Sequence, residues 1–390
     1  MNYILFDGPS RNDLLPFTFT RPVADIRVGV LSIRKKWEKH LETTTSTSTE
    51  DYLSGKWPMR LEEHNIFINS SFLPTPILVE QIKNLKSGEA ILSGEDTVAY
   101  FQDGATEPQL SELKKIEVKD EVLKIAHTWE IFSKNADAIQ LDFDLLTKGR
   151  ESYEIHESNY VKAPENIFIE EGAVVENCSL NASAGPIYIG KDVLIMEGSL
   201  IRGPLAVGEN SVIKMGAKIY GATTVGPYCK VGGEINNSVL FENTSKGHDG
   251  YLGNSVLGEW CNIGADSNNS NLKNNYAEVR IWNYNTERFA KTGLQFCGLL
   301  MGDHSKCGIN TMFNTGTVVG VSANIFGSGF PRNFIPSFSW GGSAGTSTYK
   351  IEKVFETAEM VMQRRNTELT VEDRKILHHV FDLTSKWRRG

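Results

Sequence analysis

The sequence predicts an α/β domain, then a left-handed parallel β-helix built from hexapeptide repeats, and finally a carboxy-terminal helical segment. Its 390 residues exceed the usual size of a single hydrophobic core. Strand-like and helix-like patterns alternate in the first part of the chain, which is typical of α/β domains. Aliphatic residues recur at intervals of six in the second part. We place the predicted domains at residues 1–155, 156–345 and 346–390.

The amino-terminal domain is predicted from short segments whose apolar residues have the spacing of a strand in some and of a helix in others. Residues 3–6 read as a first strand that leads into an Asp-Gly-Pro loop, and residues 29–41 have the spacing of an amphipathic helix. The Thr/Ser tract at residues 43–49 is expected to be a flexible loop. Further segments extend the alternation, with strands at 65–69 and 89–92 and a helix at 77–85.

The β-helix is predicted from an unbroken series of aliphatic residues. They stand six positions apart, at Ile189, Ile195, Ile201, Val207, Ile213, Ile219, Val225 and Val231. In an α-helix six residues turn through about 600°, so such a series would wind around the helix instead of lining one side. A triangular coil with three six-residue sides turns every member inward. The same spacing recurs on both sides of the series, at Ala163, Ile169 and Val175 and at Met301, Cys307, Phe313, Val319 and Ile325.

Two stretches interrupt the series, residues 233–250 and 272–300. We expect both to project from the solenoid as loops, where binding and catalytic residues are often found. Near the carboxy terminus, residues 350–363 and 371–386 have helical patterns, and Thr370 with Asp373 resembles a capping box. These helices are expected to cap the β-helix or to pack on a neighbouring subunit.

The composition is that of a soluble globular protein and argues against several function classes. The net charge of -8 and the pI near 5.6 disfavour a nucleic-acid partner, although they allow a local basic pocket for phosphate. The five cysteines are scattered without a C-x-x-C pair, so neither a disulfide framework nor a zinc site is predicted. No long apolar stretch and no signal-peptide pattern occur, so we expect a cytoplasmic protein without a membrane span.

The segment HDGYLGNSVLGEWCNIGADSNNSN, residues 248–271, holds the most informative side chains. His248 suits a general base, because the ordinary pKa of an imidazole is about 6.5. Tyr-Leu-Gly-Asn follows at residues 251–254, and Asn-Ile-Gly-Ala at 262–265. These motifs resemble the H-x-x-Y-L-G-[DN] and N-I-G-A segments of the bacterial family that joins glucosamine-1-phosphate acetyltransferase to N-acetylglucosamine-1-phosphate uridylyltransferase.

Three longer stretches resemble the shorter, divergent version of that family from Bacteroidetes: LPFTFTRPVADIRVG (15–29), GLQFCGLLMGDHSKCGINTMFNTGTVVG (293–320) and IPSFSWGG (335–342). The resemblance covers nearly the whole chain and implies that the α/β domain is nucleotidyltransferase-like. It also implies acetyl-CoA as cosubstrate, an amino-sugar phosphate as acceptor, and a homotrimer whose active sites lie between neighbouring β-helices.

The resemblance also implies residue roles for acyl transfer: His248 as general base, Lys214 at the sugar phosphate, Tyr251 and Asn262 on the sugar, and Asn271 and Ala265 at the acetyl-CoA end. Two departures from the family pattern stand out. The family's C-N-Y is Ser270-Asn271-Leu272 here, so its aromatic contact is missing or comes from Tyr276. A lysine expected before the histidine is replaced near residues 232–234, and Lys246 is the candidate substitute for phosphate binding.

The amino-terminal loop resembles the family's G-x-G-T-R…L-P-K segment, in which backbone N–H groups and basic residues hold the triphosphate. Gly8, Arg11 and Arg21 are therefore the predicted contacts to UTP. The lysine after Leu-Pro is Phe17 in this chain, and the metal-binding aspartate is replaced at residues 69–70 by Asn-Ser. We expect Mg²⁺-dependent uridylyl transfer only if this domain is active, and the sequence does not identify the metal ligands.

Two other functions stay open. The chain could be an acyltransferase for a different amino sugar or nucleotide-linked amino sugar, with an inactive amino-terminal domain that serves packing or regulation. It could also be a non-catalytic β-helix scaffold, which binding of acetyl-CoA would exclude. Arg388 and Arg389 are candidate CoA contacts in the terminal segment.

Overall fold

The computed structural model describes residues 1–105 and 109–388, so Arg389 lies outside the described residues. The chain divides into two compact units. The first unit comprises Met1–Leu14, Thr18–Ile26 and Leu31–His127, and the second comprises Leu15–Phe17, Arg27–Val30 and the described chain from Thr128 onward. The domain limits predicted above stay predictions.

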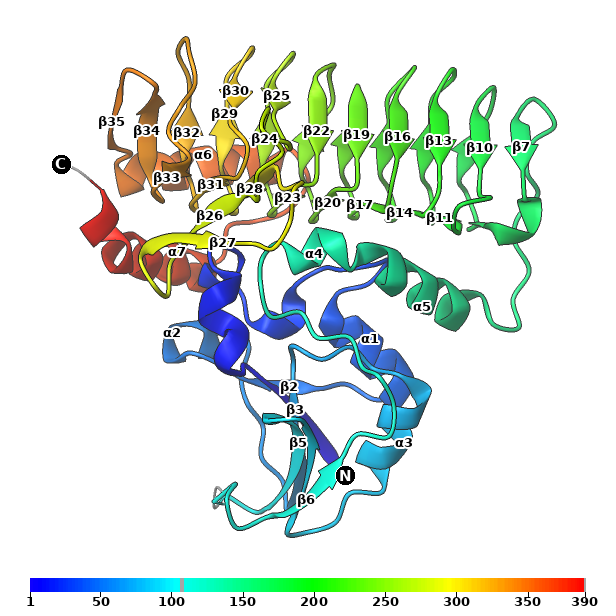
Figure 1. Ribbon diagram of the computed structural model, residues 1–390, viewed down its shortest axis with the longest axis vertical. Helices are drawn as coiled ribbons and strands as arrows, with labels where there is room; N and C mark the ends of the chain where they lie inside the picture. The colour runs from blue at the N-terminus through cyan, green and yellow to red at the C-terminus, as the bar shows by residue number, and fades with distance from the viewer. Residues whose placement is uncertain (106–108, 389–390) are drawn as a thin grey trace. The chain divides into compact units, whose positions relative to one another are not determined.

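The first unit is built on a mixed six-stranded sheet, in which Figure 1 labels β2, β3, β5 and β6. The strands follow the order β2-β1-β3-β5-β4-β6. Strand β1 pairs in parallel with β2 and β3, whereas β5 runs antiparallel to β3 and β4. The strands are β1 (Asn2–Phe6), β2 (Ser46–Ser48), β3 (His64–Asn69), β4 (Glu89–Ser93), β5 (Asp96–Asp103) and β6 (Lys114–Glu117). The prediction of a flexible loop at residues 43–49 is wrong, because the centre of this tract forms β2 and extends the sheet.

Two helices of the first unit, α1 and α3, begin at side-chain caps that the sequence provides. Ser32 accepts a hydrogen bond from the backbone N–H of Lys35, and Thr75 accepts one from that of Leu78. The helices are α1 (Ile33–Leu41), α2 (Asp51–Ser54) and α3 (Pro76–Lys83), and 3-10 turns lie at η1 (Pro9–Leu14), η2 (Phe17–Phe19) and η3 (Val23–Asp25). The amphipathic helix predicted at 29–41 is confirmed with a later start.

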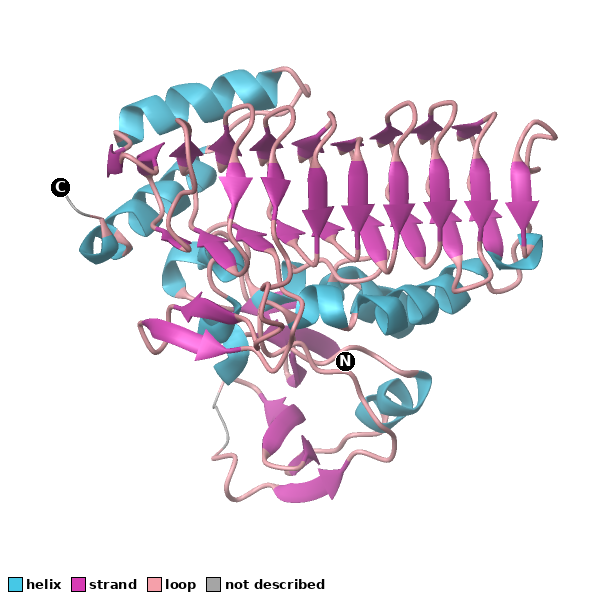
Figure 2. Ribbon diagram, turned by 45° about the horizontal axis from the view of Figure 1, so that its top comes forward, coloured by secondary structure: helices cyan, strands magenta, loops and turns pink. Residues whose placement is uncertain are grey.

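The second unit contains a parallel β-solenoid whose sides are sheets of six, nine and ten strands. Figure 2 shows its coils stacked side by side. Each strand pairs with the strand one coil later, so that Ile189 lies beside Val207 and Ile195 beside Ile213. The predicted inward series is therefore confirmed, and its side chains form one continuous apolar core.

The strands of the solenoid are short and follow the three sides in turn. The six-stranded sheet contains β7 (Tyr160–Lys162), β10 (Ser179–Asn181), β13 (Leu200–Arg202), β16 (Lys218–Tyr220), β19 (Glu234–Asn236) and β22 (Tyr251–Gly253). The nine-stranded sheet contains β8 (Ile167–Ile169), β11 (Ile187–Ile189), β14 (Leu205–Val207), β17 (Thr223–Val225), β20 (Val239–Leu240), β23 (Val256–Leu257), β28 (Leu299–Met301), β31 (Thr317–Val319) and β33 (Phe334–Ile335). The ten-stranded sheet contains β9 (Val174–Val175), β12 (Leu194–Ile195), β15 (Val212–Ile213), β18 (Lys230–Val231), β21 (Ser245–Lys246), β24 (Asn262–Ile263), β29 (Lys306–Cys307), β32 (Asn324–Ile325), β34 (Ser339–Gly342) and β35 (Gly345–Thr348).

The two predicted interruptions have different structures. Residues 233–250 do not project as a loop, because β19, β20 and β21 continue the three sheets. Two steps of this coil are shorter than six residues, from Val231 to Ile235 and from Ile235 to Leu240. The register therefore shifts, and the next inward position falls on Lys246. Residues 272–300 do leave the solenoid, and part of them forms an antiparallel hairpin of β26 (Arg280–Asn283) and β27 (Arg288–Lys291). The nine-stranded sheet then resumes where Leu300 pairs with Val256.

Helices α4 (Glu130–Ser133) and α5 (Asn135–Thr147) belong to the second unit and contact the solenoid. The Asn135 amide donates to the carbonyl of Ala222 at 2.9 Å and to the hydroxyl of Thr224 at 3.1 Å. Both groups are buried, so these hydrogen bonds fix the start of α5 on β17. Figure 1 shows α5 running beside the coils.

The carboxy-terminal helices are α6 (Ile351–Gln363) and α7 (Val371–Leu383), followed by the turn η5 (Ser385–Trp387). Val354 and Ala358 of α6 line a small cavity together with Ala323 and Asn324, so α6 lies against the ten-stranded sheet of its own chain. The capping box predicted at Thr370 is confirmed, since its hydroxyl and the Asp373 carboxylate bond each other's backbone N–H groups.

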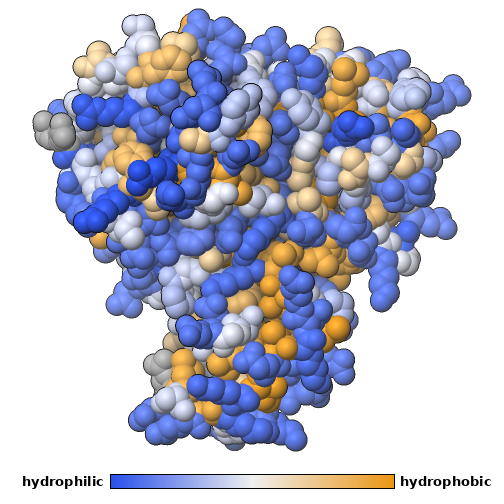
Figure 3. Space-filling view, in the orientation of Figure 1, coloured by the Kyte–Doolittle hydropathy of each residue, from blue (hydrophilic) through white to orange (hydrophobic). Residues whose placement is uncertain are grey.

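The predicted fold class is confirmed, with an α/β domain, a parallel β-solenoid and carboxy-terminal helices. In the view of Figure 3 the surface of the solenoid is mostly hydrophilic and carries separate apolar groups. Within the described residues, no helix combines the length and apolar character needed to cross a membrane.

Candidate functional site

One corner of the solenoid brings Lys214 and the segment of His248 into a single row. Lys214, Gly232, Gly247 and Gly264 follow the inward residues of four successive strands of the ten-stranded sheet, and we call these positions the corner row. A side chain at Gly232 would lie 3.0 Å from Cβ of Lys214 and 2.9 Å from the carbonyl oxygen of Gly247, so only glycine fits there. Because neighbouring strands lie about 4.8 Å apart, Lys214 is about 10 Å from the coil of His248.

His248 lies in the turn after β21, directly beyond the corner row. The residue is exposed, and among the described residues its imidazole has no hydrogen-bond partner. Its backbone is held firmly, because its carbonyl oxygen accepts a hydrogen bond of 2.6 Å from the ammonium group of Lys246. An accessible imidazole on a fixed backbone is suited to remove a proton from a bound substrate.

Lys246 does not lie where the sequence predicted. Its side chain occupies the inward position between Val231 and Ile263 and is 2% exposed. The ammonium group donates to the carbonyls of Gly232 (3.1 Å) and His248 (2.6 Å), and burial lowers the pKa of Lys246 to about 8. The prediction that Lys246 contacts the sugar phosphate does not agree with this position. Its observed contact is with the backbone of the His248 turn.

Tyr251 and Asn271 meet on the six-stranded side of the same corner. The Asn271 amide donates to the Tyr251 hydroxyl at 2.9 Å and to the Asn254 side-chain oxygen at 2.8 Å. The tyrosine ring lies over Gly253, where a methyl group would collide with its hydroxyl. Asn254 was not among the predicted site residues, although it belongs to the Tyr-Leu-Gly-Asn motif. The three polar side chains therefore form one connected group beside the turn of His248.

The remaining predicted residues of the second unit lie on neighbouring positions. Asn262 is exposed on β24 of the ten-stranded sheet, across the corner from Tyr251. Ala265 follows the corner row, and its carbonyl accepts the N–H of Asn310 at 2.8 Å. Tyr276 is 66% exposed in the excursion 272–300, which leaves its suggested aromatic contact a prediction.

The amino-terminal site has its own cavity, of about 400 Å³, at the carboxyl ends of β1 and β2. Ligands of open α/β sheets commonly bind in this position. The cavity is lined by Asp7, Gly8, Pro9, Arg11, Asn12, Ser48, Thr49, Glu50 and Asp51. Two of the three predicted nucleotide contacts, Gly8 and Arg11, are thus in its wall. Arg21 is not in this lining, and it is 4% exposed.

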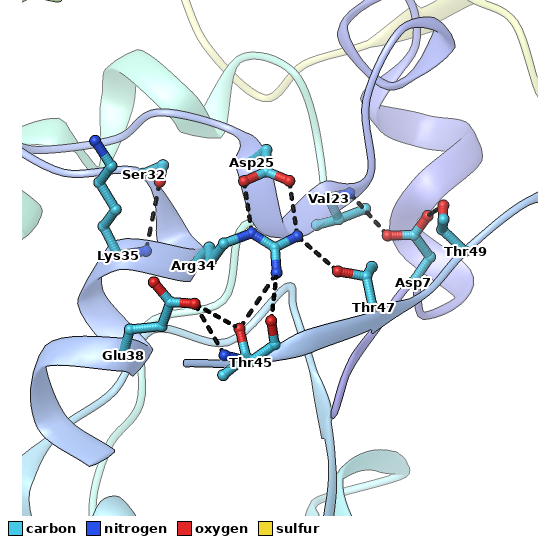
Figure 4. Close-up of polar contacts among 10 residues, drawn as sticks. All are labelled: Asp7, Val23, Asp25, Ser32, Arg34, Lys35, Glu38, Thr45, Thr47 and Thr49. Atoms are coloured by element: carbon cyan, nitrogen blue, oxygen red, sulfur yellow. Dashed lines mark hydrogen bonds and ion pairs between the residues drawn. The ribbon is translucent and has the colours of Figure 1, made fainter. Parts of the chain in front are cut away.

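Arg11 is held by groups of its own chain. Its guanidinium donates to the Asp7 carboxylate (3.1 Å), the Thr18 carbonyl (2.7 Å) and the Tyr52 hydroxyl (2.9 Å). Asp7 also accepts from the backbone N–H of Val23 and the hydroxyl of Thr49, as Figure 4 shows. Burial raises the pKa of Asp7, and these hydrogen bonds and the charge of Arg11 partly offset that effect.

The donor groups of this cavity do not fit a prepared Mg²⁺ site. Both oxygens of Asp7 already accept hydrogen bonds. Asn69, which replaces the family's aspartate, donates to the Thr97 carbonyl and accepts from the N–H of Ser71. Across the described residues, no cluster of three or more His, Cys, Asp or Glu side chains could hold a metal ion.

Comparison with known families gives a match for the amino-terminal part of the chain. Residues 3–151 match the family model of sugar nucleotidyl transferases. A search of curated proteins finds no match. Among solved structures, a UDP-N-acetylglucosamine acyltransferase of Arabidopsis is 17% identical, with 61% of this chain and 99% of that chain covered and a TM-score of 0.22. A variant of perosamine N-acetyltransferase from Caulobacter crescentus, in complex with CoA and GDP-perosamine, is 12% identical, with 84% and 94% covered and a TM-score of 0.13.

Proposed function

We propose that the second unit is an acetyl-CoA-dependent N-acetyltransferase that acts on glucosamine-1-phosphate. The observation that carries the proposal is the corner of the solenoid, where an exposed His248 on a fixed backbone lies beside the connected group of Tyr251, Asn254 and Asn271. This arrangement suits an amine acceptor that carries a phosphate. It offers an accessible base for the amine, polar groups that can orient the sugar, and a lysine in the same corner row for the phosphate.

The proposed reaction forms one amide bond and breaks one thioester bond. The sugar amine attacks the thioester carbonyl of acetyl-CoA while His248 takes the proton that the nitrogen loses. Collapse of the tetrahedral intermediate expels the CoA thiolate, and the protonated imidazole returns the proton to give the free thiol. Asn271 is proposed at the acetyl-CoA end, where its amide stabilises the developing oxyanion by exchanging its hydrogen bond to Tyr251 or Asn254 for one to that oxygen. Tyr251 and Asn262 orient the sugar.

The test is release of free thiol from acetyl-CoA in the presence of glucosamine-1-phosphate. The His248→Ala variant is expected to lose at least about 100-fold in kcat, because a general base typically contributes that much. His378→Ala is the matched control, since this histidine lies exposed on α7 beside Asp382. Full activity of the His248 variant would exclude the mechanism. Release of thiol with other amino sugars but not with glucosamine-1-phosphate would support the alternative acyltransferase function. If the protein did not bind acetyl-CoA at all, the reading as a non-catalytic scaffold would remain.

A second activity is proposed for the first unit, transfer of a uridylyl group from UTP to N-acetylglucosamine-1-phosphate. The match of residues 3–151 to sugar nucleotidyl transferases and the cavity beside Gly8 and Arg11 support it. Addition of UTP and Mg²⁺ to the coupled assay should then release pyrophosphate. Thiol without pyrophosphate would mean that this unit is inactive as a transferase.

The assembly and location of the protein are part of the same proposal. We expect a cytoplasmic homotrimer in which each corner with His248 faces a neighbouring β-solenoid. Sedimentation equilibrium should give three times the chain mass of 43.4 kDa, and a monomeric mass for the active protein would exclude a shared site.

A further inference from the structure

Four basic side chains gather on the second unit where the end of α6 reaches the solenoid. Lys230 lies on β18, next to β15, and Lys214 follows β15 in the corner row. Arg364 and Arg365 follow α6, and the guanidinium of Arg365 donates to the carbonyl of Tyr228 at 2.6 Å. Because Tyr228 is two residues before Lys230, this hydrogen bond brings Arg365 close to Lys230 on the surface of the solenoid. The cluster therefore combines residues far apart in the sequence.

The charges of this cluster are not neutralised by the protein. Within residues 1–105 and 109–388, none of the four side chains forms an ion pair with a carboxylate. The pKa of Lys230 is lowered, chiefly by the charge of Arg365, then by burial, and further by Lys214 and Arg364. By contrast Lys218, on the adjacent six-stranded side, is paired with Glu234. The mutual repulsion of these like charges raises the free energy of the ligand-free protein.

We propose that Lys214, Lys230, Arg364 and Arg365 form a binding site for the phosphate groups of a substrate, which α6 completes. A bound phosphate would accept charge-assisted hydrogen bonds from these side chains and relieve their mutual repulsion. The proposal rests on the function above, and it adds the role of α6, which that function does not assign. The distance between the cluster and the candidate base follows from the corner row, since Lys214 lies about 10 Å from the coil of His248. A phosphate in the cluster would leave the reactive end of the same ligand near that histidine.

Arg365 is the residue through which the carboxy-terminal helix contributes. Its hydrogen bond to Tyr228 uses Nη1, and the planar guanidinium has further N–H groups for a phosphate. Arg364 is exposed and adds charge from the same turn. The site could not be predicted from the sequence, because these arginines and Lys230 are far apart in the chain.

The first test measures binding of inorganic pyrophosphate to the full chain by calorimetry, which needs no catalytic activity. Lys230→Gln and Arg365→Gln are each expected to weaken binding about 10-fold or more, because a hydrogen bond to a charged group is lost. Lys218→Gln is the matched control, since it removes an exposed lysine from the neighbouring side of the solenoid. Within the described residues the Lys230 side chain forms no hydrogen bond or ion pair, so the result for Lys230→Gln does not depend on how α6 docks. Absence of pyrophosphate binding, or equal affinity in all four proteins, would overturn the proposal.

A second measurement identifies the source of the phosphate. If the cluster holds the sugar phosphate, both variants should raise KM for glucosamine-1-phosphate about 10-fold and leave KM for acetyl-CoA unchanged. If the cluster holds the phosphates of CoA, both variants should instead raise KM for acetyl-CoA and leave KM for glucosamine-1-phosphate unchanged. Unchanged KM values for both substrates would overturn the site in an active enzyme. Lack of acyl transfer in the wild-type protein would instead count against the proposed function, while the pyrophosphate result would stand by itself.

Discussion

Replacing Lys246 by methionine removes an ammonium group from the interior of the solenoid and keeps an unbranched side chain that can fill the same space. The position is 2% exposed and lies between Val231 and Ile263 in an otherwise apolar row. The titratable groups that face Lys246 are Asp249 and the thiol of Cys307, whose pKa is raised by burial. The substitution therefore asks what a buried positive charge costs this fold.

The cost depends on pH in a defined direction. Burial lowers the pKa of Lys246 from 10.5 to about 8, so the folded protein pays to keep the proton below pH 8. Between the two pKa values the unfolded chain binds a proton that the folded chain has released. Stability of the wild-type protein therefore rises with pH through this window, relative to a variant that has no charge there. The difference between the two pKa values corresponds to about 3 kcal/mol, of which about 2 to 3 kcal/mol develops between pH 7 and pH 10.

The assay is urea unfolding of the wild-type protein and of Lys246→Met, monitored by circular dichroism. It is repeated at pH 7, 8, 9 and 10 at constant ionic strength. The quantity of interest is the difference between the two free energies of unfolding, because the titration of groups that do not interact with Lys246 cancels in it. It should move in favour of the wild-type protein by about 2 to 3 kcal/mol across the series. A difference that stays constant within about 0.5 kcal/mol would refute the buried charge and the reasoning from it.

Three further substitutions test other parts of the structure. Gly253→Ala places a methyl group against the Tyr251 hydroxyl, so kcat/KM for acetyl transfer should fall about 10-fold in steady-state kinetics, and an unchanged value would argue against a role for that hydroxyl. Asp25→Asn weakens the bidentate pair with Arg34 that Figure 4 shows, and urea unfolding should report a loss of about 2 kcal/mol, whereas no loss would mean that the pair contributes nothing net. Thr370→Ala removes the cap of α7 and should cost about 1 kcal/mol, while Thr370→Ser should keep it; equal losses would exclude the hydroxyl as the cause.

The solenoid was predictable from the sequence because its stability repeats with the chain. Each inward residue, such as Ile195, meets the same kind of neighbour one coil later, so the requirement for an aliphatic side chain recurs at a constant interval. The capping box at Thr370 was equally predictable, because its partners lie within one turn. The motif of His248 and Tyr251 could be found for a similar reason, since short spacing brings both residues to one corner.

Residues 43–49 and 233–250 show where local patterns were not enough. The Thr/Ser tract has the composition of a loop, yet its hydrogen bonds to β1 make it a strand, and such pairing depends on a distant segment. In the second stretch the sides of the coil shorten and the ladders continue, which no fixed period reveals.

The sequence by itself determined the α/β domain, the solenoid core and the candidate base His248, because each depends on residues that are close in the chain or repeat along it. Only the tertiary structure decided that Lys246 points inward, because the shortened coil reverses which side chain faces the core. Only it could bring Arg365 to Tyr228 and Lys230, because that contact is set by the packing of α6 across many residues of intervening chain. Charges that meet through such long-range packing leave no spacing in the sequence from which they could be read.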